Sequence, residues 1–355
     1  MTIFAFRQTA DNQVHQADEL GLLSIETDVG ITGVSLLGEP RRGALLDALS
    51  LVRALKPVVV GENALDHEGI WQNMIRRHRD TTLRAIGAVD VALWDLAGKI
   101  AGQPIHGLLG RTREKAPAYL TLTGLERLER YVDEARKAYA KGYRALKIHP
   151  PCELGVAEEI CRAVRQALPP EIKLMADFAW SLNLGEAVRI GRVLEKLNYN
   201  WFEDPLPMDD IENYSSLRRK LDIPILATER ASGGFSGFSR WIRAEATDFL
   251  RGDPGSKGGI TALIKGAHVA EAFNLRFELH HGGNAANNAA NLNLLMSLSN
   301  AEYFEMAYSG ELQYHGVRDP ICIDSEGFVH APTGSGLGLN IDNSCIEALT
   351  VDVIG

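Results

Sequence analysis

The sequence predicts an α/β fold: a modified TIM barrel of the (β/α)7β type with an α+β capping domain. From about residue 117, eight short apolar segments alternate with seven segments of helical length. Such alternation is typical of parallel strands joined by helices. Asp177, Glu203 and Glu229 each follow one of these apolar segments, and each lies 26 residues from the next. An open doubly wound sheet would show the same alternation, but only a closed barrel brings all the strand ends to one mouth.

Each predicted strand of the barrel is a short apolar run, and the segments between the runs have helical spacing of apolar residues. The strands are expected at 118–123, 145–149, 172–176, 200–202, 224–227, 247–250, 276–279 and 302–304. The helices are expected at 127–141, 154–168, 185–198, 209–220, 236–244, 260–273 and 285–298. No helix of the repeat follows the last strand.

The first third of the chain predicts a smaller layer beside the barrel. Residues 1–40 contain two strand-like runs and turn glycines, and residues 82–101 form the most helix-like segment, rich in alanine and leucine. Residues 310–355 are rich in glycine and lack the barrel repeat, so we expect them to return to this layer. The sequence therefore predicts a capping domain at 1–115, completed by 310–355, and a catalytic barrel at 116–309.

Composition narrows the classes of protein that the chain can represent. It has 355 residues, 45% of them hydrophobic, and a formal net charge of −9, with lysine and arginine scattered along the chain. A nucleic-acid surface is therefore not expected, and no apolar run is long enough to span a membrane. The four cysteines show no CxxC spacing, and the N-terminus lacks a basic region followed by an apolar stretch. We expect a cytoplasmic protein with reduced thiols.

The three acids predict a metal site. Three carboxylates at one barrel mouth repel one another unless a cation lies among them. A set of oxygen ligands with open positions suits Mg²⁺ or Mn²⁺.

Other predicted strand ends also carry polar residues. Lys147 and His149 alternate at the second strand, so they share one face. Asp253 follows the sixth strand, His280 the seventh and Glu305 the eighth. A single such residue is usually structural, but eight at the mouth of one barrel indicate an active site.

These motifs resemble the mandelate racemase/muconate lactonizing enzyme subgroup of the enolase superfamily over essentially the whole chain. The segment AIGAVDVALWDLAGKIAGQPIHGLLG at 85–110 resembles the end of the family's capping domain. MADF, WFEDP and ATER match its three metal ligands, and Asp253 followed by GGIT and then His280 matches its Asp–His dyad. The resemblance implies Mg²⁺ bound by Asp177, Glu203 and Glu229, and a small carboxylate substrate. It also leads us to expect a homo-oligomer.

One position departs from the family pattern. The subgroup has Lys-x-Lys at the second strand, whereas this chain has Lys147-Ile148-His149. Histidine has an ordinary pKa of about 6.5, so His149 could exchange a proton near neutral pH. Whether it serves as base, as acid or in substrate binding stays open.

The resemblance implies a reaction that begins with loss of the proton α to a carboxylate, through an enediolate that the metal stabilises. His280, oriented by Asp253, would be the base; its neighbour His281 would point elsewhere. Lys147 and a protonated Glu305 would assist the substrate carboxylate. With His149 as acid the outcome is dehydration of a sugar acid to a 2-keto-3-deoxy acid, which we favour.

Other outcomes remain for the same residues. Departure of an internal oxygen gives cycloisomerisation of an anhydro or lactone sugar acid, and two bases give a racemase or epimerase. A metal-binding barrel without turnover is a further alternative, against which the intact Lys147, Asp253 and His280 argue.

Several residues near the mouth could meet the substrate. Asn284, Asn287 and Asn288 could contact hydroxyl groups or could cap a helix, and Trp180 could line the pocket or pack on the rim. The capping loops at 8–20 and 37–42 would cover the mouth. Within the second of these, Arg41 and Arg42 could reach a second substrate charge.

Overall fold

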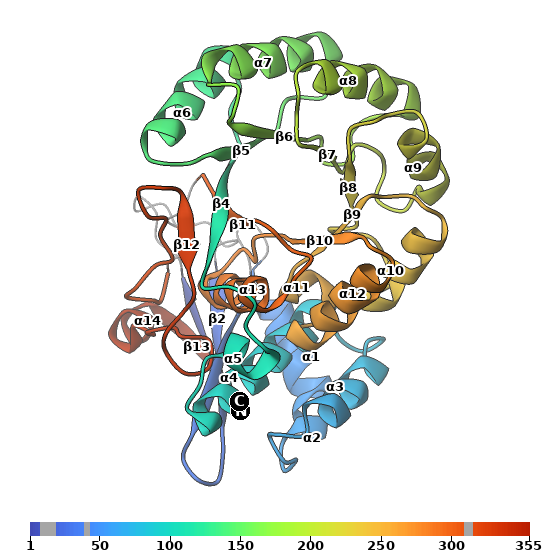
Figure 1. Ribbon diagram of the computed structural model, residues 1–355. Helices are drawn as coiled ribbons and strands as arrows, with labels where there is room; N and C mark the ends of the chain where they lie inside the picture. Colours follow the sequence, from blue (N-terminus) through green and yellow to red (C-terminus); the bar gives the residue numbers. More distant parts are fainter. Residues whose placement is uncertain (8–18, 39–42, 309–314) are drawn as a thin grey trace.

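The computed structural model describes residues 1–7, 19–38, 43–308 and 315–355 (Figure 1). The loop at 8–18, Arg41 and Arg42 therefore lie outside the described residues. Within the described part of the chain, the first layer is an antiparallel sheet in the order β13-β1-β2-β3. Its strands are β1 (Thr2–Arg7), β2 (Glu19–Glu26), β3 (Thr32–Leu37) and β13 (Thr350–Ile354).

The C-terminal segment returns to both layers. Strand β13 pairs with β1, as expected, but β12 (Phe328–His330) pairs antiparallel with the first barrel strand β4 (Lys115–Leu122). Helix α14 (Asn343–Leu349) lies between β12 and β13 along the chain.

The helices of the first layer follow β3 along the chain. They are α1 (Leu45–Ala54), α2 (Lys56–Val59), α3 (His67–Arg76), α4 (Leu83–Ala101) and α5 (Ile105–Leu109). Helix α4 begins where the Thr82 side chain accepts a hydrogen bond from Ala85 N and ends at Gly102, whose φ of 65° suits glycine. Most of its alanines and leucines are buried because α4 lies between the sheet and the barrel.

The second layer is the predicted barrel. Its parallel strands follow the order β10-β9-β8-β7-β6-β5-β4-β11. After β4 they are β5 (Ala145–Ile148), β6 (Lys173–Asp177), β7 (Trp201–Glu203), β8 (Ile225–Ala227), β9 (Phe249–Gly252), β10 (Arg276–Leu279) and β11 (Phe304–Ala307). The helices are α6 (Leu128–Ala140), α7 (Leu154–Ala167), α8 (Leu184–Lys196), α9 (Ile211–Arg218), α10 (Gly234–Arg243), α11 (Pro254–Lys257), α12 (Ile260–Ala272) and α13 (Ala285–Ser297).

The ring of strands encloses side chains rather than a channel. Figure 1 shows α6 to α9 outside the strands. Aromatic and apolar side chains fill the interior below the mouth: Tyr119, Ala145, Met175, Trp201, Leu226, Phe249 and Tyr303. They form the packed floor on which the polar mouth rests.

Side chains and a loop contact link β10 to β11. No ladder pairs these two strands in the described residues, so the sheet curls without full backbone closure. The Glu278 carboxylate accepts a hydrogen bond from Tyr303 N at 3.2 Å, and Phe277 N donates to Asn300 O at 2.9 Å. The short helix α11 directly follows Asp253. The sequence did not predict a helix at this position.

Helix α4 of the capping layer packs closely against the barrel and is hydrogen-bonded to it. A Cβ on Gly87 would lie 2.2 Å from the carbonyl oxygen of Pro254. Asp90, three residues later, accepts hydrogen bonds from the backbone and hydroxyl of Thr261 at 2.9 and 2.7 Å. Helix α4 therefore holds the segment that carries Asp253. Among the described residues, no helix has the length and apolar character needed to cross a bilayer.

Candidate active site

The three spaced acids meet at the carboxyl ends of the strands. Asp177 ends β6 and is paired in register with Glu203, which ends β7. Glu229 follows β8 by two residues. All three are buried, and one oxygen from each lies within 4.8 Å of the others. The parallel register predicted from the 26-residue spacing thus brings the carboxylates together.

This donor set fits a hard divalent cation. Burial and then the neighbouring Glu203 raise the pKa of Asp177 well above its usual range, because the charged form lacks solvent and faces like charge. A cation among the three oxygens would relieve both effects. Oxygen ligands alone match the preference of Mg²⁺.

Lys147 lies beside the three acids and Glu305. Its Nζ is 2.8 Å from Glu203 Oε1, 2.9 Å from Glu305 Oε1 and 3.5 Å from Asp177 Oδ2. Burial by itself would lower the pKa of Lys147, but Glu203 and Glu305 hold it well above its usual range. The ammonium group is therefore charged.

His280 and Asp253 form the predicted pair. His280 Nδ1 is 3.0 Å from Asp253 Oδ2, and Nε2 is 3.4 Å from Glu229 Oε1. The Asp253 carboxylate also accepts from the backbone and hydroxyl of Ser256, both at 2.8 Å, at the start of α11. Burial would raise the pKa of Asp253, but the bond to His280 holds it low. Nδ1 therefore faces Asp253, and Nε2 faces the Glu229 carboxylate.

His281 does not point away as expected. Its ring centroid is 4.2 Å from that of His280, at an angle of 36°. Burial, followed by the charge of His280, lowers the pKa of His281 to about 4. Its backbone N–H donates to Glu305 at 2.9 Å. His280, rather than His281, contacts Asp253.

His149 lies beside Asp177, at the end of β5. Its Nε2 is 3.4 Å from Asp177 Oδ2. Loss of solvent around the ring and then the charge of Lys147 lower the pKa of His149 to about 3. The ring is therefore neutral at pH 7, whereas the sequence led us to expect a group that titrates near neutrality. Burial of the ring in the folded protein is the first reason for the difference, and the charge of Lys147 is the second.

Glu305 is ionised, so the expectation of a protonated, hydrogen-bond-donating Glu305 is wrong. Burial would raise its pKa, but Arg251 and Lys147 hold it well below its usual range. Glu305 accepts hydrogen bonds from Thr121 Oγ1 at 2.5 Å and from Arg251. A carboxylate that accepts these bonds has no proton to donate.

Arg251 is the site residue that sequence reasoning missed. It lies on β9, is completely buried, and its Nε is 3.0 Å from Glu203 Oε1. A signal was present: an arginine interrupts the apolar run DFLRG two residues before Asp253. Residues two apart on a strand share a face, so the pattern indicated an inward cation.

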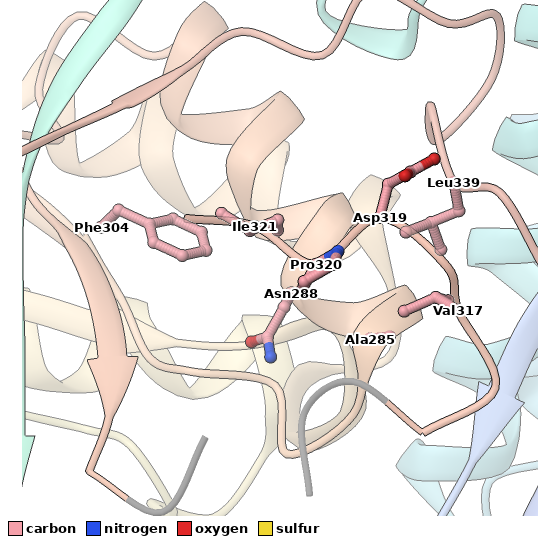
Figure 2. Close-up of a pocket in the computed structure, with 8 residues that line it drawn as sticks. All are labelled: Ala285, Asn288, Phe304, Val317, Asp319, Pro320, Ile321 and Leu339. Carbon is pink, nitrogen blue, oxygen red and sulfur yellow. The ribbon is translucent and has the colours of Figure 1, made fainter. Parts of the chain in front are cut away.

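Asn284, Asn287 and Asn288, at the start of α13, form hydrogen bonds with backbone groups near the mouth. Asn284 accepts from Asn287 N at 2.9 Å as the cap of α13, and its amide donates to Gly38 O at 2.8 Å on the capping layer. Asn287 and Asn288 bond the backbone of Gly282 at 3.1 and 2.8 Å. Figure 2 shows Asn288 at a small pocket beside Phe304, which Val317, Pro320, Ile321 and Leu339 also line. Asn284 therefore caps α13, as the capping alternative expected, whereas Asn287 Oδ1 and Asn288 Nδ2 have no hydrogen-bond partner among the described residues.

Trp180 lies on the rim of the mouth. Its φ of 63° is in the left-handed region, and its backbone N–H donates to the Asp204 carbonyl oxygen at 2.7 Å. It lines a groove of about 540 Å³ between the two layers, together with His78, Thr81, Thr82, Leu83, Arg84, Met208, Arg230, Gly255 and Ser256. Trp180 thus lines a groove, as one of the two alternatives expected.

Contacts thus link all eight predicted residues within one barrel mouth. The family model for the mandelate racemase/muconate lactonizing enzyme N-terminal domain matches residues 5–110, and the enolase C-terminal domain-like model matches residues 130–345. The chain belongs to the enolase superfamily. Within it, the two models together place the chain in the mandelate racemase/muconate lactonizing enzyme family, as the motifs indicated.

Relatives within the enolase superfamily include dehydratases and cycloisomerases. The chain is 28% identical to arabinonate dehydratase of Saccharolobus solfataricus, over 93% of this chain and 90% of that protein. It is also 28% identical to D-galactarolactone cycloisomerase of Agrobacterium fabrum, over 92% and 89% of the two chains.

Solved structures of the superfamily share the fold. D-glucarate dehydratase from Agrobacterium tumefaciens, complexed with magnesium, is 31% identical, with a TM-score of 0.87 over 99% of this chain and 98% of that one. The 3,6-anhydro-D-galactonate cycloisomerase from Zobellia galactanivorans is 26% identical, with a TM-score of 0.89 over 99% of both chains.

Proposed function

We propose that the protein is a Mg²⁺-dependent lyase that dehydrates a sugar acid to a 2-keto-3-deoxy acid. The observation that carries this proposal is the His280–Asp253 pair, whose free ring nitrogen is 3.4 Å from the Glu229 carboxylate. A base beside a cation site is what removal of an α-proton from a carboxylate requires. The dehydratases among the relatives support the same class of reaction.

Asp177, Glu203 and Glu229 would hold the cation, and Mn²⁺ could replace Mg²⁺. When bound, the cation supplies positive charge that stabilises the enediolate form of the substrate carboxylate. Lys147, charged and buried, adds a second cationic group at the same place. Ionised Glu305 would fix the Lys147 ammonium instead of donating to substrate.

His280 would take the α-proton on Nε2 while Asp253 stabilises the resulting imidazolium. The β-hydroxyl would then leave as water with a proton from the protonated form of His149, and the enol product would tautomerise to the keto acid. We assign His149 to the leaving group, because its ring lies beside Asp177 on the side of the site away from Glu229 and His280. Negative charge that develops on the substrate would raise the pKa of His149 from its low value.

Cycloisomerisation is the second candidate. It needs the same base and cation, but the leaving group is an internal oxygen of an anhydro or lactone sugar acid. The galactarolactone and anhydrogalactonate cycloisomerases among the relatives favour it over racemisation or epimerisation. We further propose a cytoplasmic homo-oligomer. A metal-binding protein without turnover is disfavoured by the intact base pair.

The proposed function is tested by incubating the Mg²⁺-loaded protein in D₂O with aldonic, uronic and aldaric acids and their lactones. We expect deuterium at the α-carbon or a keto-acid product with at least one substrate. His280→Asn should lower turnover by about 10²–10⁴-fold, the usual contribution of a general base. A keto-acid product with the same mass as its anhydro or lactone substrate, formed by ring opening without loss of water, would indicate a cycloisomerase. No exchange and no product across the panel would refute the sugar-acid proposal.

A further inference from the structure

A groove with two arginines lies between the capping layer and the barrel. This groove of about 540 Å³ has Arg84 of helix α4 on its capping side and Arg230, which follows strand β8, on its barrel side. Among the described residues that line it, none is an aspartate or a glutamate. An anionic group in the groove would therefore meet two guanidinium groups without facing a lining carboxylate.

The groove adjoins the proposed cation site and the proposed base. Arg230 Nε is 3.0 Å from Oε1 of Glu229, one of the three proposed cation ligands. Ser256, which also lines the groove, donates from Oγ to Asp253 Oδ2 at 2.8 Å, and the same carboxylate oxygen contacts His280. A substrate with one carboxylate at the cation site and its α-carbon beside His280 can therefore extend the rest of its chain into the groove.

A buried carboxylate holds Arg84 in position. Arg84 Nε is 2.7 Å from Asp47 Oδ2, and a terminal nitrogen donates to Asp47 Oδ1 at 3.2 Å. Asp47 is fully buried and also accepts a hydrogen bond from Thr82 Oγ1 at 2.7 Å. The Arg84 side chain nevertheless keeps 32% of its surface exposed. Because a guanidinium carries five N–H donors in one plane, the edge bound to Asp47 orients the group, and the other donors remain for a ligand.

We propose that Arg84 and Arg230 bind a second anionic group of the substrate, at the end remote from the carboxylate at the cation site. The inference rests on the proposed function and narrows its substrate class to a sugar acid with an anionic group at each end. A carboxylate at the second end makes the substrate an aldaric acid, and a phosphate makes it a phosphorylated aldonic acid. Both groups form charge-assisted hydrogen bonds with a guanidinium, whereas the neutral hydroxymethyl end of an aldonic acid does not.

The test measures ligand binding to Mg²⁺-loaded His280→Asn protein, in which removal of the base prevents turnover, by isothermal titration calorimetry. The probes are the aldaric, aldonic and 6-phosphoaldonic acids of glucose, galactose and mannose. We expect a probe with two anionic ends to bind at least about tenfold more tightly than the aldonic acid of the same sugar, the effect of one charge-assisted hydrogen bond. Preference for the aldaric acid identifies a carboxylate, and preference for the 6-phosphoaldonic acid identifies a phosphate. Equal binding within each sugar, or no binding of any probe with two anionic ends, would overturn the proposal.

Arg84→Gln in the same background assigns the preference to the groove. We expect the tenfold preference to fall below about threefold, while the affinity for the aldonic acid changes by less than about threefold. The matched control is Arg243→Gln on the exposed surface of helix α10, outside the groove, which should keep the full preference. Equal weakening of all the acids in Arg84→Gln would indicate that Arg84 only joins α1 to α4, and would overturn the proposal.

A second variant keeps the test decisive if Arg84→Gln folds poorly because Asp47 is left buried without its cation. The double variant Asp47→Asn/Arg84→Gln removes both charges and should also lose the preference. Circular dichroism confirms folding of each variant.

Failure of this proposal is distinguishable from failure of the proposed function, because binding needs no turnover. Turnover of aldonic acids by the wild-type protein, without any preference for a second anionic group, would refute the groove subsite alone. A preference that depends on Arg84, without α-proton exchange or product in the wild-type protein, would refute the reaction alone.

Discussion

At the scale of single residues, environment decides what each ionisable group can do. His149 and His280 are the same residue type, yet His149 lies near Lys147, whereas His280 bonds Asp253. Glu305 and Asp177 are both buried carboxylates, but contact with Arg251 and Lys147 lowers the pKa of one, while burial and Glu203 raise that of the other. Charged neighbours therefore separate roles that composition alone leaves equal.

His149→Asn should separate proton removal from departure of the leaving group. If His149 serves the leaving group, α-proton exchange catalysed by His280 continues, whereas product formation falls by about 10²-fold or more. Exchange is followed by proton NMR in D₂O and product by keto-acid assay. Loss of exchange together with product would contradict this assignment and indicate a role in substrate binding.

At the scale of elements, helix α4 positions the segment after β9. The close approach of Gly87 to Pro254 leaves no space for a side chain, and the next turn of α4 binds Thr261 through Asp90. The helix is apolar over most of its surface because it is buried on both sides. Its alanine and glycine content therefore serves close packing as well as helix formation.

Gly87→Ala should destabilise the protein although alanine favours helices. The new Cβ would meet Pro254 O at 2.2 Å, so we expect a loss of about 1–3 kcal/mol, typical of overpacking. Gly69→Ala in α3 is the matched control, because a Cβ there meets nothing within 4 Å. The control should gain about 0.5–1 kcal/mol from helix propensity. Chemical denaturation measures both, and equal effects would contradict the packing argument.

At the scale of the whole molecule, the proposed cation site links stability to pH through Asp177. The metal-free protein holds Asp177 with a raised pKa, so its folded state keeps a proton that the unfolded chain releases above about pH 4. The stability of the metal-free protein therefore falls as pH rises above that value. A bound cation favours the ionised form and removes this loss.

Mg²⁺ should therefore raise the melting temperature more at pH 8 than at pH 5.5. At a hundredfold excess over its dissociation constant, a ligand of the folded state adds about 2.7 kcal/mol. Differential scanning fluorimetry with and without EDTA measures the shift. Asp177→Asn should lose most of the shift and its pH dependence; an equal shift at both pH values in the wild-type protein would contradict the coupling.

Periodicity in the sequence was enough to predict the barrel and most of its mouth. The alternation of apolar strands and helices indicates a parallel sheet buried on both faces, and the 26-residue interval corresponds to one strand–helix repeat. The positions of the side chains at the strand ends follow from these two patterns. The boundaries of the capping domain at 1–115 and the barrel at 116–309 stay predictions.

By itself, the sequence determined the fold, the family and which eight residues line the mouth, because these depend on local pattern and register. Only the tertiary structure decided the charge states, since a pKa depends on neighbours from other strands. It neutralised His149 mainly through burial and ionised Glu305 through Arg251 and Lys147. It also engaged the asparagines of α13 with backbone groups. Burial and contacts between segments far apart in the sequence, which no linear spacing contains, account for these differences.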